Sequence, residues 1–184
     1  MIAAGIQAAG TRAYEYVDKN FGLRFDGSQV DVRRSEKAMS LDVRQYEDGT
    51  TVASGLSDST KDKWLGFLAD RAGYIRGAYS LVTHGNPDVL TMRGIEYDNP
   101  YEIAEVIKAN GWKEGQPITI YGCEFAGGHG QTAWQLSQIL GVPVAAAENS
   151  VYPGAMAMGI DFTKWRTFAP EPVGAVYDWR KYYK

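Results

Sequence analysis

Residues 118–123 read Ile118-Thr119-Ile120-Tyr121-Gly122-Cys123, a short apolar run that ends in the only cysteine of the chain. Such an uninterrupted apolar run is typical of a strand buried inside a parallel sheet. The glycine-rich residues 124–130 follow directly and leave space around the thiol. Open α/β sheets place their functional sites at the carboxyl ends of their strands. We therefore expect Cys123 to lie at such a sheet edge.

A second apolar run precedes a histidine upstream. Residues 79–83 read as a strand and are followed by His84-Gly85. If this strand neighbours the strand that ends at Cys123, the imidazole and the thiol emerge at the same edge of the sheet. The sequence therefore predicts a dyad of Cys123 and His84.

The middle of the chain alternates between strand and helix patterns. In chain order these are a strand at 79–83, a short strand at 89–92, a helix from Asn99-Pro100 to Asn110-Gly111, the strand at 118–123, a helix at 130–140 and a strand at 142–146. Alternation of this kind implies right-handed crossovers and a parallel sheet. We expect one α/β domain with a mainly parallel sheet flanked by helices.

Residues 1–73 and 147–184 flank this 74–146 core. The alternating apolar residues of 29–52 lead to Asp48-Gly49, which indicates an antiparallel hairpin near the N-terminal side. Short helices are predicted at about 11–20 and 57–72. Residues 147–184 are rich in aromatic side chains, which we expect to pack on the sheet, and their prolines argue against long helices.

Composition excludes several classes of protein. The chain has 184 residues, 19 basic against 22 acidic, and a formal net charge of −3 without a long basic run, so no nucleic-acid partner is expected. One cysteine forms no internal disulfide. The first ten residues lack the charged region of a secretory signal, and no apolar run reaches the roughly 18–20 residues of a membrane span. We expect a soluble protein.

The pair of residue types suits acyl transfer. An ordinary thiol with a pKa of about 8.5 is only a few per cent thiolate at neutral pH, so it needs a base. His84 would accept the proton and Cys123 would attack as the nucleophile. The backbone N–H groups of Gly85 and Cys123 are candidate donors to the oxyanion of the intermediate, although Gly85 also suits simple turn geometry.

Other interpretations of the same residues stay open. Cys123 is alternatively a buried core thiol. His129 is a second candidate base, although its place at the start of a helix favours a helix-terminal or solvent-exposed role. A zinc site with Asp88 or Glu124 lacks the usual short ligand spacing. Residues 127–130 resemble a phosphate loop only weakly, because the lysine of such loops is missing. We expect neither a metal nor a cofactor.

Four blocks together resemble the caspase-like cysteine peptidases, and among these most closely the peptidase-like domains at the C-termini of bacterial polymorphic and secreted toxins. The blocks are Leu81-Val82-Thr83-His84-Gly85, Asn99-Pro100-Tyr101-Glu102-Ile103-Ala104, Ile118-Thr119-Ile120-Tyr121-Gly122-Cys123 and 135–144. The resemblance covers residues 74–146 and does not extend to the substrate-binding parts of the family.

The resemblance implies a three-layer caspase-like fold and a thiol protease with His84 and Cys123 as catalytic residues. It implies a bacterial toxin or effector that cleaves a protein or peptide, that a dedicated system delivers into a target cell, and that a cognate immunity protein restrains. Two alternatives share the same residues: a non-catalytic interaction module, and a thiol amidase or acyltransferase acting on an amide outside proteins, such as cell-wall peptide.

Overall fold

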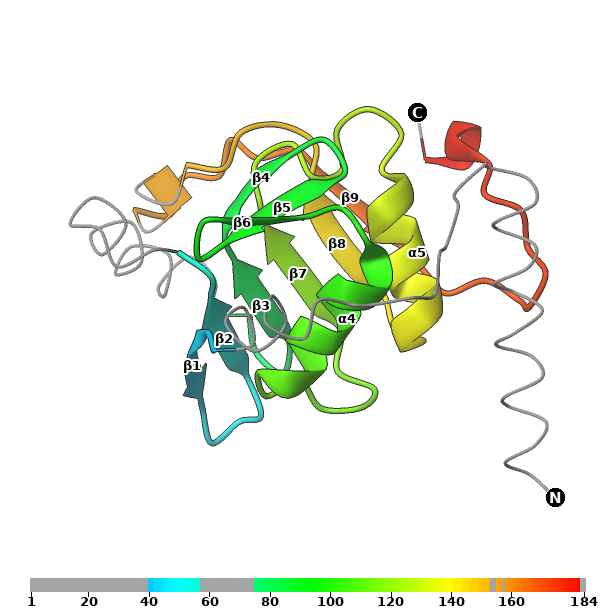
Figure 1. Cartoon of the computed structure of the whole chain (residues 1–184). Coiled ribbons are helices and arrows are strands. Elements are labelled where there is room, and N and C mark those ends of the chain that lie inside the picture. Colours follow the sequence, from blue (N-terminus) through cyan, green and yellow to red (C-terminus); the bar gives the residue numbers. More distant parts are fainter. Residues whose placement is uncertain (1–39, 57–74, 153–154, 157, 183–184) are drawn as a thin grey trace, which may run out of the picture.

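The computed structural model describes residues 40–56, 75–152, 155–156 and 158–182. At their centre is a six-stranded sheet (Figure 1). In spatial order its strands are β1 (Asp42–Gln45), β2 (Thr51–Ser54), β3 (Tyr79–Val82), β7 (Ile118–Tyr121), β8 (Val144–Ala147) and β9 (Trp165–Phe168). The four central strands run parallel, and the edge strands β1 and β9 are antiparallel to their neighbours. The prediction of an α/β protein with a mainly parallel sheet is confirmed.

A small antiparallel sheet lies above the carboxyl ends of β3 and β7 (Figure 1). It consists of β4 (His84–Asn86), β5 (Val89–Met92) and β6 (Ile95–Tyr97). The chain passes from β3 into β4 through a single residue, Thr83, whose hydroxyl donates a hydrogen bond to the carbonyl of Thr91 at 2.5 Å. Of this sheet the sequence predicted only β5.

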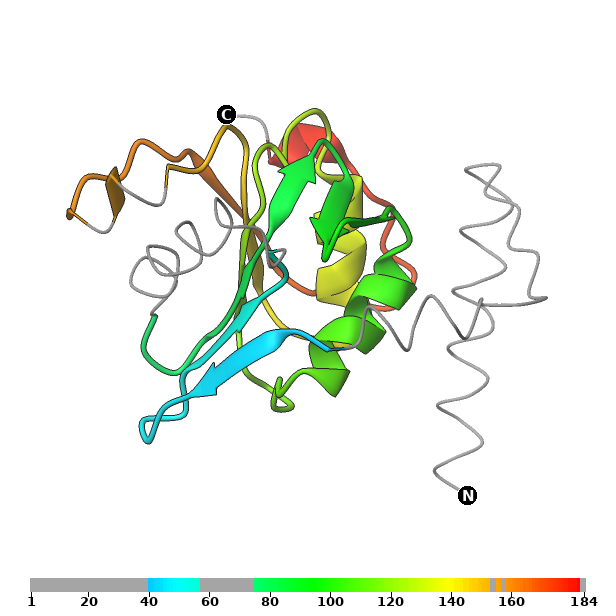
Figure 2. The same cartoon turned by 60° about the vertical axis from the view of Figure 1, so that its left-hand side comes forward.

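The helices α4 (Pro100–Ala109) and α5 (Gln131–Leu140) both cover one face of the large sheet (Figures 1 and 2). The predicted start of α4 is confirmed, because the Asn99 side chain accepts a hydrogen bond from the N–H of Tyr101 at 2.9 Å. Helix α5 begins after its N-cap residue, Gly130, which has no side chain to cap the helix. Asp88, in the turn between β4 and β5, instead accepts from the Thr132 N–H at 3.0 Å.

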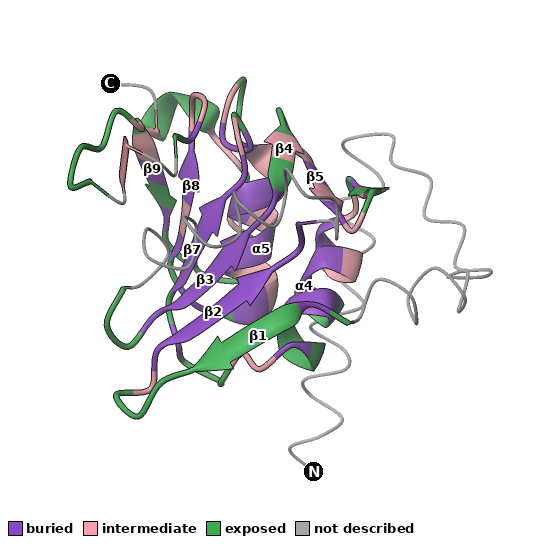
Figure 3. Cartoon of the chain, turned by 90° about the vertical axis from the view of Figure 1, so that its left-hand side faces the viewer, coloured by how far each residue is buried: buried purple, intermediate pink, exposed green. Residues whose placement is uncertain are grey.

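Alternation along the strands divides the core between two faces. Tyr79 and Leu81 of β3 face the helices, whereas Val82 belongs to a second cluster on the opposite face. Burial at the centre of the sheet contrasts with β1, which is exposed throughout (Figure 3). The second cluster contains Val52, Leu56, Val82, Tyr121, Ala147 and Val151, with Cys123, Met156 and Trp165 packed against it. Buried side chains on both faces of the sheet therefore reach the ends of the strands, where the site is predicted.

Several predicted boundaries shift in the structure. The hairpin at Asp48-Gly49 is confirmed by the pairing of β1 with β2, although Val43 is exposed rather than inward. The predicted strand that ends at His84 is two short strands instead. Strand β9 was not predicted. The expected helices at 11–20 and 57–72 and the first part of 29–52 lie outside the described residues. No helix among the described residues is long and apolar enough to cross a membrane.

Candidate active site

The carboxyl ends of β3 and β7 bring two predicted site residues opposite each other. The parallel register pairs Val82 with Tyr121, and the Thr83 N–H continues the ladder by donating to the Tyr121 carbonyl at 3.3 Å. Continued by two residues, the same register sets His84 across from Cys123. Cys123 packs against the cluster of Val82 and Tyr121, whereas His84 is the first residue of β4 and pairs with Thr91 in the small sheet.

Glycines allow the two segments to touch. A Cβ atom on Gly85 would lie 2.9 Å from the Cys123 carbonyl oxygen and 3.1 Å from the carbonyl carbon of Gly122. A Cβ atom on Gly122 would in turn lie 3.7 Å from the His84 carbonyl oxygen. The backbone that carries the histidine thus packs directly on the backbone that carries the cysteine, at van der Waals distance and without intervening side chains.

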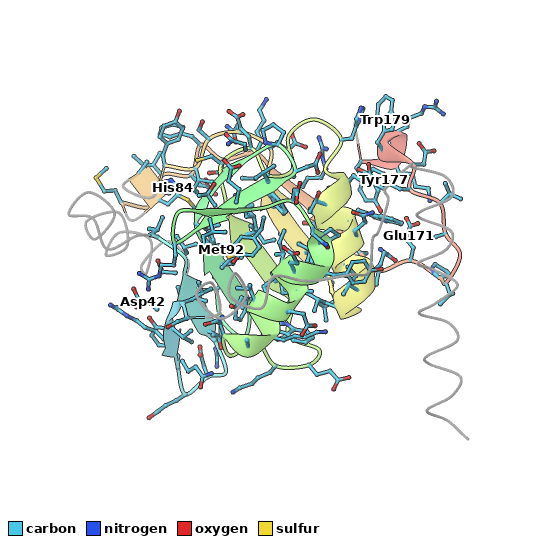
Figure 4. All side chains as sticks on the ribbon, in the orientation of Figure 1. Asp42, His84, Met92, Glu171, Tyr177 and Trp179 are labelled. Carbon is cyan, nitrogen blue, oxygen red and sulfur yellow. The ribbon has the colours of Figure 1, made fainter. Side chains whose placement is uncertain are left out.

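The thiol and the imidazole differ in their surroundings. Cys123 is half-buried, and its Sγ atom lies 3.4 Å from the Val151 N–H, which donates to it, and 4.0 Å from the Val151 carbonyl. His84 is exposed at the start of β4 (Figure 4). Between these two described residues the structure contains no hydrogen bond. The structure thus aligns the two backbones, while the thiol side chain rests on Val151.

Two backbone N–H groups near the thiol remain available. Among the described residues, the Cys123 N–H has no hydrogen-bond acceptor, whereas the Glu124 N–H donates to the Asn149 carbonyl at 3.1 Å. In β4, Gly85 pairs with Leu90 of β5. The next pair along this hairpin is the one that closes its two-residue turn. Hydrogen-bonded and non-hydrogen-bonded pairs alternate in an antiparallel ladder, so the Gly85 N–H points away from β5. These two groups are the predicted oxyanion donors.

The loop after the thiol is tightly folded. Glu124 has a φ of 57°, a left-handed conformation that is uncommon for a residue with a side chain, and its carbonyl accepts from the Gly127 N–H at 2.6 Å. Asp88 joins this loop to the small sheet, because its N–H donates to the Phe125 carbonyl at 3.3 Å. Strain maintained by surrounding hydrogen bonds is a frequent property of functional sites.

The other histidine contacts the C-terminal segment. The His129 ring lies 5.0 Å from the Trp179 ring, and its carbonyl accepts a hydrogen bond from the Tyr177 hydroxyl. Figure 4 shows Tyr177 and Trp179 on the C-terminal segment, near the short 3-10 helix η1 (Trp179–Lys181). These contacts join His129 to the C-terminal segment. No group of three possible metal ligands occurs among the described residues.

Sequence reasoning missed a buried arginine beside the loop. The Arg166 side chain in β9 is 6% exposed, and its Nε and Nη2 atoms each lie 2.6 Å from Oε1 of Glu148. Its Nη1 atom donates to the Ala126 carbonyl at 3.1 Å. An arginine in the aromatic stretch Trp165–Phe168 was the available signal, because a charged residue in an inward strand position needs a partner.

An acidic residue and two aromatic residues lie together on the face of the sheet that carries Tyr121. The Trp165 ring packs edge-on against Tyr121 at 5.1 Å, and its indole N–H donates to Asp161 at 2.8 Å. Burial and the nearby Asp161 charge raise the pKa of Tyr121 to about 12. Although desolvation acts in the opposite direction, hydrogen bonds from Trp165 and Thr163 lower the pKa of Asp161.

Comparison with known proteins matches the chain to a protein family. A family model described as a domain of unknown function (DUF8616) matches residues 60–161, more than half of the chain. The matched range includes β3, β7 and the loop after Cys123. No curated protein and no solved structure matches the chain.

Proposed function

The chain belongs to the DUF8616 family, and because that description assigns no activity, we propose from the site itself that the protein is a cysteine peptidase with Cys123 as nucleophile and His84 as base. The observation that carries the proposal is the packing of Gly85 on the Gly122-Cys123 backbone at the carboxyl ends of β3 and β7. This packing supports a site in which the thiol, the imidazole and two backbone N–H groups act together.

The contact between the two backbones, where Gly85 packs on Gly122 and Cys123, supports proton transfer after rotation of the two side chains. In the proposed reaction, Cys123 Sγ attacks the substrate carbonyl carbon and its proton passes to the His84 ring. The N–H groups of Gly85 and Cys123 hold the oxyanion.

The intermediate then collapses by breaking the bond between carbon and nitrogen. The leaving amine takes the proton from His84, and a thioester remains on Cys123. Water attacks the thioester, His84 accepts a proton from that water, and the acid and free thiol are released. Each step uses only groups of the described chain and water, so the mechanism uses no cofactor.

A peptide substrate follows from the resemblance to caspase-like peptidases and toxin domains. The short antiparallel sheet that begins at His84 and the parallel order of β2, β3, β7 and β8 support a caspase-like arrangement. On this proposal the protein is an effector that cleaves a protein in a target cell, and an immunity protein is its natural inhibitor.

The test is the rate at which iodoacetamide alkylates Cys123 between pH 5 and 9 in the parent, His84→Ala and His129→Ala. A thiol assisted by His84 should react at pH 6 about tenfold faster in the parent than in His84→Ala. His129→Ala is the matched control and should behave as the parent. Equal rates in the parent and His84→Ala would contradict the dyad.

A second measurement addresses the substrate. The protein is incubated with a cell extract, and new protein N-termini are identified by mass spectrometry against a Cys123→Ala control. We expect cleavage products that need Cys123. If the dyad passes the alkylation test but no Cys123-dependent N-terminus appears, an amidase acting outside proteins is the better assignment.

A further inference from the structure

The buried ion pair of Arg166 and Glu148 is directly connected to the loop that follows Cys123. The guanidinium lies 2.6 Å from the Glu148 carboxylate and donates its third contact, at 3.1 Å, to the Ala126 carbonyl. The Arg166 side chain is 6% exposed and that of Glu148 is 29% exposed, so the guanidinium makes these bonds largely out of contact with water. Three segments therefore meet at one side chain: β9, the end of β8 and the cysteine loop.

The same loop residue is held from its other side. The Ala126 N–H donates to the Ala147 carbonyl at 2.8 Å, and two residues earlier the Glu124 N–H donates to Asn149 at 3.1 Å. The loop thus runs back along the segment that follows β8. Without the guanidinium, the carbonyl of Ala126 would lose its charged donor, and the pairing with residues 147–149 would no longer be anchored at that end.

We propose that Arg166 is a positioning residue, which holds the loop of Cys123 so that the thiol can reach His84; this rests on the proposed function. The planar guanidinium suits this role because it bonds a carboxylate and a carbonyl at once, at fixed angles. A lysine has one point charge on a flexible stem and cannot keep both contacts in the same geometry.

The experiment compares variants of the ion pair in the full chain. Arg166→Met combined with Glu148→Leu removes both charges, so that no unpaired charge stays buried and folding is preserved. Arg93→Met combined with Asp42→Leu is the control, because that pair, 3.0 Å apart, joins β1 to the small sheet away from the loop. Near-ultraviolet circular dichroism and urea unfolding establish that each variant is folded.

The measured quantity is the ratio of alkylation rates at pH 6 with and without His84, obtained by adding His84→Ala to each background. In the parent and the control pair we expect a ratio of about ten. In the Arg166/Glu148 variant the ratio should fall to about one, and Arg166→Lys should lie between. An unfolded chain would itself give a ratio of about one, because its thiol reacts as an ordinary thiol with or without His84. The ratio is therefore compared only between variants that circular dichroism and urea unfolding show to be folded.

The outcomes separate the two proposals. A ratio near one in the parent refutes the dyad, and the positioning role is lost with it. A ratio of about ten in the parent that persists in the Arg166/Glu148 variant leaves the dyad intact and refutes the positioning role. If the variant does not fold, Arg166→Lys decides by the same criterion, and an undiminished ratio there overturns the inference.

Discussion

Gly85→Ala is the substitution that tests the packing of β4 on the cysteine loop. The added Cβ atom would lie 2.9 Å from the Cys123 carbonyl oxygen and 3.1 Å from backbone carbons of Gly122, closer than Cβ atoms normally approach other atoms. All these neighbours are backbone atoms, so relief requires β4 or the loop to move. Overpacking of this kind costs about 1–3 kcal/mol, and the loss of glycine freedom in the unfolded chain offsets about 0.4–1 kcal/mol.

The net expectation is a loss of about 1–2 kcal/mol in the free energy of unfolding, measured by urea unfolding followed by circular dichroism. Gly122→Ala is the comparison, because the one close contact of its Cβ atom, at 2.7 Å, would be with the end of the Leu90 side chain rather than with backbone, while the His84 carbonyl oxygen lies at an ordinary 3.7 Å. It should lose less stability than Gly85→Ala. A Gly85→Ala protein as stable as the parent would refute the close contact and, with it, the alignment of His84 with Cys123.

Two further predictions concern neighbours of the site. Asp88→Ala removes the acceptor for the Thr132 N–H and should lower the free energy of unfolding, measured in urea, by about 1–2 kcal/mol. Asp88→Asn keeps an acceptor and tolerates the positive φ of this position, so it should lower that free energy less. Equal losses would contradict the capping role. The pKa of Tyr121 is raised to about 12 by burial and then by Asp161, so its contribution to stability is complete below about pH 10 and is lost as the pH rises through 12. Tyr121→Phe should therefore reduce the decline in stability between pH 10 and 12 by about 2 kcal/mol, and an unchanged slope would contradict the shift.

The sequence predicted the elements whose pattern is local. The cap at Asn99, the turn at Asp48-Gly49 and the apolar run before Cys123 each depend on neighbouring residues, and each appears where expected. The small sheet after β3 was missed for a physical reason. Its strands are three or four residues long, and their stability comes from pairing and from packing against the cysteine loop rather than from their own pattern.

In the candidate site, too, some features could be predicted from the sequence and tertiary contacts could not. The approach of His84 to Cys123 could be predicted because parallel neighbours share their carboxyl ends. Arg166 and Glu148 could not, because 18 residues separate them and nothing in the sequence indicates that β8 and β9 pair antiparallel. The contact of Cys123 with Val151 is likewise tertiary: it depends on how the chain leaves β8.

Two contacts from opposite sides fix the cysteine loop, and this determines how the proposed site would work. Asp88 bonds the Phe125 carbonyl from the small sheet, and Arg166 bonds the adjacent Ala126 carbonyl from β9. Consecutive carbonyls of one loop are thus held by different sheets, so the loop backbone cannot shift toward either sheet without breaking a bond to the other. The thiol, in contrast, makes long hydrogen bonds with Val151 and packs against the cluster of Val82 and Tyr121. Bringing Cys123 Sγ to His84 therefore requires side-chain rotation over a fixed backbone, which leaves the N–H of Cys123 in place for the oxyanion.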